Sequence, residues 1–247
     1  MEASEAVGKA IKKASNGIGV RNERSLHAAL KQWYAQPDDR FEIPLNGFVI
    51  DLVRGEQLIE IQTRNFTVIR RKLQELVKTH QVHLLHPVTI EKWVVQTNRS
   101  GSEIISRRKS PTKGKLTDLF EELVRIPELM MHPHFSVEFL LIREEEVRCK
   151  DGQGSKRRKR ESLKDRRLLE VIEARIFHRP EDFLAILPSD LPQPFSNKCL
   201  AESLKLPLFR CRQITYSLRK MEAITLAGKR GNELLYNRQE ALQESLD

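Results

Sequence analysis

Residues 41–80 read FEIPLNGFVIDLVRGEQLIEIQTRNFTVIRRKLQELVKTH, and they carry the clearest structural pattern in the chain. Its first part holds three short apolar runs, which are separated by the turn-forming pairs Asn46–Gly47 and Arg54–Gly55. Its second part, residues 65–80, places apolar side chains at the spacing of one helix face. The stretch therefore predicts a meander of three strands followed by an amphipathic helix.

The sequence around this stretch predicts one larger domain over residues 21–150. We expect a further helix, two strands, a hairpin with an exposed loop, a helix and a long strand, at residues 22–35, 81–88, 89–97, 98–115, 116–130 and 135–149. This order is typical of a mixed α/β domain built on one sheet. Residues 1–20 are polar and rich in small side chains, and we expect them to form a flexible leader.

Charge and cysteine content indicate the class of partner and the compartment. The chain has a net charge of +9, and residues 151–231 hold 18 Lys/Arg against 10 Asp/Glu. Such an excess favours a polyanionic partner. The three cysteines form no CxxC pair, and no apolar run is long enough to cross a membrane. We therefore expect a cytoplasmic protein with no membrane contact, associated with the nucleoid if it binds DNA.

A basic stretch, residues 151–164, separates the first domain from the C-terminal third of the chain. It contains Lys156, Arg157 and Arg158 among glycines and serines. The stretch is predicted to be a linker, and its basic side chains are either solvated or laid on phosphates. Both interpretations remain open, and they are compatible with each other.

Residues 165–237 carry the pattern of a second domain. Residues 165–177 have apolar side chains at helical spacing, and Ser196 is a candidate N-cap for a short helix that ends before Pro207. A second helix and a two-stranded ribbon with a basic turn, Gly228-Lys-Arg-Gly231, follow. This arrangement resembles the winged helix-turn-helix domains. Residues 238–247 would be a tail.

The resemblance implies a surface for nucleic acid. The second helix would be the recognition helix, with Arg210, Arg212, Gln213 and Arg219 pointing outward, because Arg and Gln pair with base edges. Lys229 and Arg230 on the ribbon would meet phosphates or the minor groove. The partner would be double-stranded DNA. Winged helices also act as protein adaptors, so that alternative stays open, as does a homodimer.

Two carboxylates in the first domain point to a metal site. Asp51 ends one predicted strand, and Glu60 lies on the next strand, with Gln62 on the same face two residues later. A hairpin would bring Asp51 close to Glu60, and two acids there repel each other unless a cation bridges them. Oxygen ligands favour Mg²⁺ or Mn²⁺. The alternative is that both are ordinary exposed acids at strand ends.

This pattern resembles the PD-(D/E)XK nuclease superfamily, which includes many restriction enzymes. The resemblance covers residues 22–87 and implies that Asp51 and Glu60 bind the metal. It gives Glu23 the place of a helical acid, and Gln62 stands where the family expects Lys. The fold class implied is a restriction-endonuclease-like α/β domain with a C-terminal winged helix. The function implied is metal-dependent hydrolysis of DNA, and an inactive DNA-binding regulator is the alternative.

Overall fold

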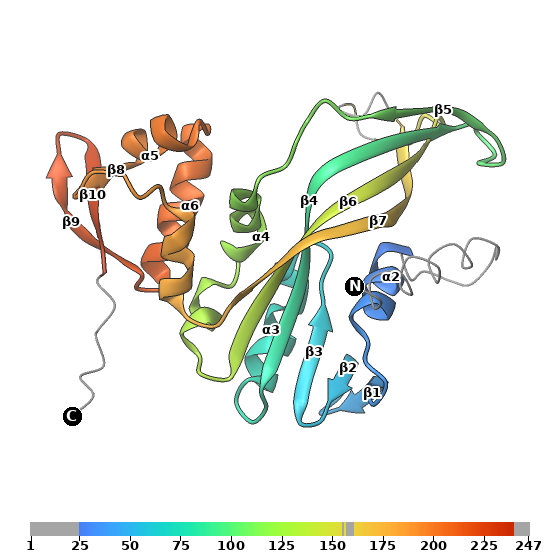
Figure 1. Cartoon of the computed structure of the whole chain (residues 1–247), viewed down its shortest axis with the longest axis horizontal. Coiled ribbons are helices and arrows are strands. Elements are labelled where there is room, and N and C mark those ends of the chain that lie inside the picture. Colours follow the sequence, from blue (N-terminus) through green and yellow to red (C-terminus); the bar gives the residue numbers. More distant parts are fainter. Residues whose placement is uncertain (1–24, 155, 157–160, 240–247) are drawn as a thin grey trace, which may run out of the picture.

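The computed structural model describes residues 25–154, 156 and 161–239, and its centre is a seven-stranded mixed sheet (Figure 1). The strand order is β1-β2-β3-β4-β6-β7, and β5 pairs with β4. The β3–β4 and β4–β6 pairs are parallel, and the other pairs are antiparallel. The strands span Arg40–Leu45 (β1), Phe48–Arg54 (β2), Gln57–Ile61 (β3), Val82–Thr97 (β4), Ile104–Lys109 (β5), Phe135–Cys149 (β6) and Ser162–Phe177 (β7). The expected mixed α/β class is confirmed.

The meander and its helix form as the sequence predicts. Asn46 (φ 50°) and Gly47 (φ 79°) both adopt the left-handed conformation that a two-residue hairpin turn requires. The turn between β2 and β3 likewise has Gly55 at φ 57°. Helix α3 (Phe66–Leu76) follows β3 and buries the apolar face that includes Phe66 and Leu73.

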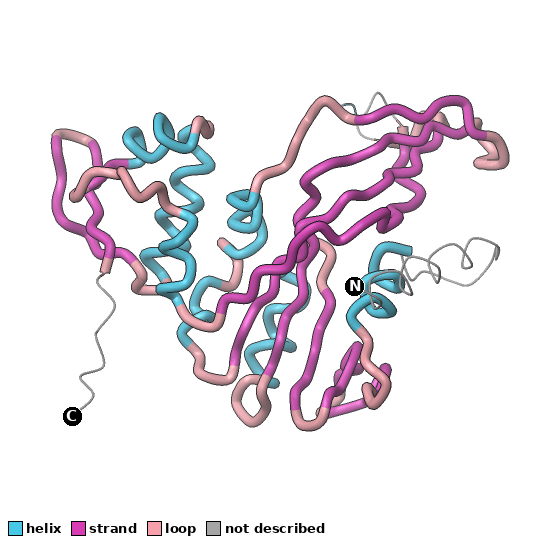
Figure 2. Tube along the Cα trace, in the orientation of Figure 1, coloured by secondary structure: helices cyan, strands magenta, loops and turns pink. Residues whose placement is uncertain are grey.

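Helices cover both faces of the sheet. Helix α2 (Ser25–Tyr34) packs Leu26 and Leu30 against Leu52 and Ile59 on one face. On the other face lie α3 and a short helical segment made of η1 (Leu116–Leu119), α4 (Phe120–Leu123) and η2 (Pro127–Met131). The single helix expected at residues 116–130 is thus replaced by three short pieces. In Figure 2, drawn in the orientation of Figure 1, the upper parts of β4, β6 and β7, together with β5, extend beyond α3 and α4.

Residues 82–97 form one continuous strand instead of the two that the sequence predicts. Pro87 suggests a break, because proline cannot donate a hydrogen bond to a sheet. The last β4 residue paired with β3 is Leu85, so Pro87 lies where β4 has no neighbour on this side. Between Leu85, where the pairing with β3 ends, and Trp93, where the pairing with β5 begins, this side of β4 is an edge, where proline is tolerated.

The helix expected at residues 165–177 is wrong, since Ser162–Phe177 is strand β7, paired antiparallel with β6. Three irregularities in this pairing leave Lys164, Leu169 and Ile172 as extra residues. Such bulges interrupt the alternation that identifies a strand. The sheet domain therefore continues to Phe177, and the basic stretch connects two neighbouring strands instead of two domains.

The C-terminal unit has two helices and a small sheet. After η4 (Pro180–Ile186) come β8 (Phe195–Ser196), α5 (Asn197–Leu204), α6 (Leu208–Lys220), β9 (Ile224–Arg230) and β10 (Glu233–Arg238), with the strand order β8-β10-β9. Ser196 caps α5 as predicted: its Oγ accepts hydrogen bonds from the backbone N–H groups of Lys198 and Cys199. The turn of the ribbon lies at Gly231–Asn232, two residues after the expected centre at Lys229–Arg230, which instead end β9.

The two parts share one hydrophobic core. Phe120 of α4, Phe177 of β7, and Leu218 of α6 belong to the same buried cluster. Residues 1–24 and 240–247, which include the expected leader and most of the tail, lie outside the described residues. Within the described part of the chain, no helix is long and apolar enough to cross a membrane.

Candidate active site

The candidate site is a pocket of about 430 Å³ where β2 and β3 separate. The two strands pair from Leu52 opposite Ile59 to Arg54 opposite Gln57. At the pocket end, Asp51 Oδ2 accepts a hydrogen bond from the backbone N–H of Ile61 at 2.8 Å. A side chain thereby satisfies a backbone donor at the point where the pairing ends. The side chains that line the pocket include those of His27, Asp51, Glu60, Gln62, Arg71 and Lys72.

Asp51 stays ionised because its partners outweigh its burial. Burial raises the pKa of Asp51, but the hydrogen bonds from His27 and from the Ile61 N–H together lower it by more than burial raises it. The pKa of Asp51 is therefore below its usual value. His27 comes from α2, lines the same pocket, and its Nε2 lies 3.2 Å from Asp51 Oδ2. These two partners therefore keep the Asp51 carboxylate charged.

Glu60 is buried, with 2% of its surface exposed, so it is not an ordinary exposed acid. Lys72 Nζ, from α3, lies 2.5 Å from Glu60 Oε1. The same ammonium donates to Val49 O at 2.5 Å, and within the described residues Glu60 Oε1 makes no hydrogen bond of good geometry. Burial raises the pKa of Glu60 to about 7; Lys72 opposes this rise, and the charge of Asp51 adds to it.

Gln62, the residue after β3, lines the same pocket as Glu60, but its amide nitrogen is engaged. Gln62 Nε2 donates to Arg64 O at 2.5 Å and to Asn65 O at 3.2 Å, both in the turn that leads into α3. The backbone oxygen of Gln62 contacts Nδ1 of the buried His86 at 2.6 Å. Only the side-chain oxygen of Gln62 remains to interact with a water in the pocket.

The residues fit a divalent cation in donor chemistry, although the set is small. Asp51 and Glu60 offer carboxylate oxygens, which Mg²⁺ and Mn²⁺ prefer, and Glu60 Oε1 is already ion-paired with Lys72. Among residues 25–154, 156 and 161–239, no group of three or more His, Cys, Asp or Glu residues is arranged to hold a metal. Glu23, the expected helical acid, lies outside these residues.

Sequence reasoning missed Lys72 and the role of His27. Lys72 lies twelve residues after Glu60, on a different element, so no short motif links them. A signal did exist: Lys72 lies beside the buried stripe of α3, next to Leu73 and three residues after Ile69. Helical side chains lean toward the N-terminus of their helix, which here begins beside the end of β3.

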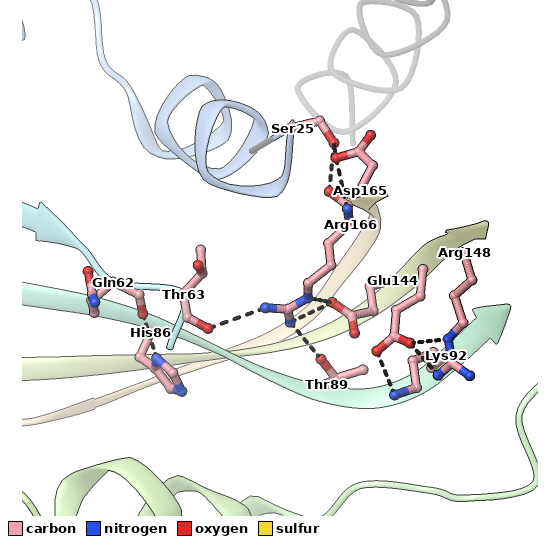
Figure 3. A network of polar contacts seen from close by, with 11 residues as sticks. Ser25, Gln62, Thr63, His86, Thr89, Lys92, Glu144, Arg148, Asp165 and Arg166 are labelled. Atoms are coloured by element: carbon pink, nitrogen blue, oxygen red, sulfur yellow. Dashed lines mark hydrogen bonds and ion pairs between the residues drawn. The ribbon is translucent and has the colours of Figure 1, made fainter. Parts of the chain in front are cut away.

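Arg166 of β7 forms hydrogen bonds with segments that border this pocket (Figure 3). Arg166 Nε donates to Glu144 Oε2 at 2.8 Å, and its Nη1 reaches Thr63 O at 3.3 Å in the turn after Gln62. Ser25 Oγ, at the start of α2, donates to Arg166 O at 2.6 Å. Strand β7 therefore contacts both α2 and the turn after β3, two segments that contribute residues to the pocket.

The four residues of α6 expected to contact nucleic acid differ in their exposure to solvent. Arg210 forms ion pairs with Glu121 and, at 3.9 Å, with Asp118, so its expected outward position is wrong. These acids belong to η1 and α4, against which α6 packs. Arg212 and Arg219 are exposed as predicted. Gln213 is only half-exposed, and its buried Oε1 has no hydrogen bond among the described residues.

The remaining expected contacts lie at two separate places. Lys229 and Arg230 are exposed beside the turn of the β9–β10 ribbon, and Arg230 lies 3.4 Å from Glu233. Lys156 is exposed in the connection between β6 and β7. Arg157 and Arg158 lie outside the described residues.

Comparison with known proteins gives a family and a relative. The family model described as "Domain of unknown function (DUF8091)" matches residues 24–178, which end one residue after β7. An uncharacterized protein of Treponema pallidum (strain Nichols) is 31% identical over 223 residues, covering 90% of this chain and 88% of the relative. No solved structure matches the chain.

Proposed function

The chain belongs to the DUF8091 family, and from the site in its own chain we propose that it binds DNA and hydrolyses phosphodiester bonds with a divalent metal ion. One observation carries the proposal: Asp51, Glu60 and Lys72 meet in one pocket at the end of a meander. Two acids and a lysine are the groups that a nuclease of the PD-(D/E)XK type uses. Here the lysine comes from α3 instead of from the position of Gln62.

The lysine supports this proposal because it restores the charge that Gln62 lacks. An ammonium group beside two carboxylates can bind a phosphate oxygen or polarise a water. Lys72 reaches the pocket from α3 and lies at the same carboxylate that the resemblance assigns to the metal. A bound Mg²⁺ or Mn²⁺ would supply Lewis-acid stabilisation of the phosphate and would activate a water.

The other pocket residues support specific roles in holding and orienting the substrate. Asp51 and Glu60 would hold the metal, and His27 keeps Asp51 ionised through their contact. Arg71, which is exposed on α3 and lines the same pocket, is placed to bind a substrate phosphate. Each of these roles belongs to a residue whose side chain faces the pocket.

The C-terminal unit supports the DNA-binding half of the proposal. The order of β8, α5, α6 and the β9–β10 ribbon resembles that of a winged helix, in which α6 would be the recognition helix. Arg212, Arg219 and Lys229 offer exposed positive charge there. We propose that this unit holds DNA while the pocket on the sheet cuts it.

A cleavage assay tests the proposal. The full chain is incubated with supercoiled plasmid and with short single-stranded and branched DNA, in Mg²⁺, Mn²⁺ or EDTA. We expect metal-dependent cutting that is lost in Asp51→Asn and Lys72→Met, while DNA retardation on a gel persists. Glu56→Gln, which removes an exposed acid in the β2–β3 turn, is the matched control and should cut normally. Cutting that survives Asp51→Asn contradicts the proposal.

A second candidate function is DNA binding without cleavage, as in a regulator. It is favoured by the Lys72–Glu60 ion pair, which already neutralises one proposed metal ligand. It predicts DNA retardation that is the same in Mg²⁺ and EDTA, with no cutting of any substrate. If the chain neither binds nor cuts DNA, the adaptor interpretation of the winged helix takes its place.

A further inference from the structure

Helix α6 presents a stripe of aromatic and basic side chains to solvent. Phe209, Arg212, Tyr216 and Arg219 are spaced by three, four and three residues, so they lie on one helix face. Phe209 is 59% exposed and Tyr216 is 44% exposed. Large exposed aromatic side chains interleaved with arginines mark an interaction surface.

The charge on this helix selects the kind of partner. Helix α6, all of which the structure describes, carries four basic residues and no acidic residue. Lys229 and Arg230 add positive charge on the ribbon that follows. A surface of this kind is complementary to a phosphate backbone, and arginine also stacks on flat rings.

The first turn of α6 is not free to enter a duplex groove. In helix-turn-helix proteins the N-terminal residues of the recognition helix contact base edges in the major groove. Here Arg210 is paired with Glu121 and Asp118, and α6 lies directly beside α4 (Figure 1). The sheet domain therefore packs against the Arg210 side of this turn and hinders insertion of the helix end into a duplex groove, while Phe209 stays exposed.

We propose that the stripe formed by Phe209, Arg212, Tyr216 and Arg219 binds single-stranded DNA, with unpaired bases stacked on the two aromatic rings. The inference rests on the proposed function only in taking DNA as the ligand. In a duplex, neighbouring base pairs cover the base faces and only edges are accessible. In a single strand the faces are accessible, and an aromatic side chain can stack on any of them, while the arginines bind the phosphates.

A binding measurement tests this assignment independently of cleavage. Fluorescence anisotropy in EDTA compares three labelled ligands of equal length: a thymidine 20-mer, a duplex, and an abasic strand that keeps the phosphates. We expect the 20-mer to bind more tightly than the other two. Phe209→Ala and Tyr216→Ala should each weaken binding of the 20-mer by about tenfold and leave binding of the abasic strand unchanged. Phe41→Ala, an exposed aromatic on β1, is the matched control.

Each other outcome overturns the inference. Tighter binding of the duplex, or equal weakening of all three ligands by the two variants, would assign α6 to the duplex or to the backbone alone. No binding of any ligand would also reject it. Because both side chains are exposed, the variants should fold, and circular dichroism verifies this. Metal-dependent cutting that is lost in Asp51→Asn would still support the proposed function. A failure of the single-strand assignment can therefore be distinguished from a failure of the cleavage proposal.

Discussion

Lys72 Nζ lies 2.5 Å from Glu60 Oε1, although the two residues come from different elements, α3 and β3. Glu60 is almost fully buried, so its charge depends on this ammonium. A buried charge without its partner is strongly destabilising. The pair therefore links the stability of the fold to the chemistry of the pocket.

Removing the lysine should cost stability in a pH-dependent way. In the unfolded chain Glu60 ionises near pH 4.5, but in the folded protein it does so near pH 7. The folded state thus binds more protons between these values, and the contribution of Glu60 to stability falls as pH rises through this window. In Lys72→Met the loss should be about 3 kcal/mol or more at pH 8 and smaller at pH 5.

Urea unfolding at both pH values measures this loss. Lys78→Met is the matched control, because it removes an exposed lysine paired with Glu75 and should be nearly neutral. An equal loss in Lys72→Met at pH 5 and pH 8 would show that Glu60 does not control the stability of the pocket.

Metal binding by the pocket should tighten as pH rises through about 7. Burial raises the pKa of Glu60 to about 7, and only the carboxylate form can bind a cation. Asp51, whose pKa is lowered, is already ionised in this range. Titration of Mn²⁺ followed by electron paramagnetic resonance at pH 6 and pH 8 tests this. Glu60→Gln should remove the pH dependence; its persistence in that variant would place the titrating group elsewhere.

Replacing Arg166 should destabilise the sheet domain. Arg166 Nη2 lies 2.6 Å from Oε2 of Glu144, which is 2% exposed. Arg166→Met would leave this carboxylate buried without its partner, at a cost of about 3–5 kcal/mol. Arg167→Met, at the exposed neighbouring position, should cost under about 1 kcal/mol. Thermal unfolding compares the two variants, and similar melting temperatures would contradict the role of Arg166 as an anchor.

The ribbon of the C-terminal unit should contribute to DNA affinity by binding phosphates. Replacing Lys229 or Arg230 with Ala should reduce the slope of log affinity against log salt by about one for each phosphate that the variant no longer neutralises. Anisotropy titrations over a series of salt concentrations give the slopes. Glu222→Ala, which removes an exposed acid near the ribbon, serves as control and should leave the slope unchanged. An unchanged slope in both basic variants would exclude the ribbon from the interface.

Much of the candidate site could be predicted from the sequence because it depends on local patterns. The turns at Asn46–Gly47 and Gly55 identified the meander, and the strand-end positions of Asp51 and Glu60 predicted that these two acids lie close together. Lys72 was not accessible in this way, since its approach to Glu60 depends on how α3 packs across the sheet.

Strand β7 shows why local periodicity can mislead. Leu168, Leu169, Ile172 and Ile176 have helical spacing, yet Leu169 and Ile172 are extra residues in bulges. Each bulge shifts the alternation by one residue, so a period of two becomes irregular. Only the pairing with β6 establishes that the segment is a strand.

Local sequence patterns were sufficient to predict the meander, the helices α2, α3, α5 and α6, and the cap at Ser196, because turn geometry, amphipathic spacing and capping act within a few residues. Long-range packing was needed to show that β7 completes the sheet, that Arg210 faces Glu121, and that Lys72 reaches Glu60. These contacts join residues far apart in the chain, and their energies depend on burial and on neighbouring charges, which no local pattern encodes.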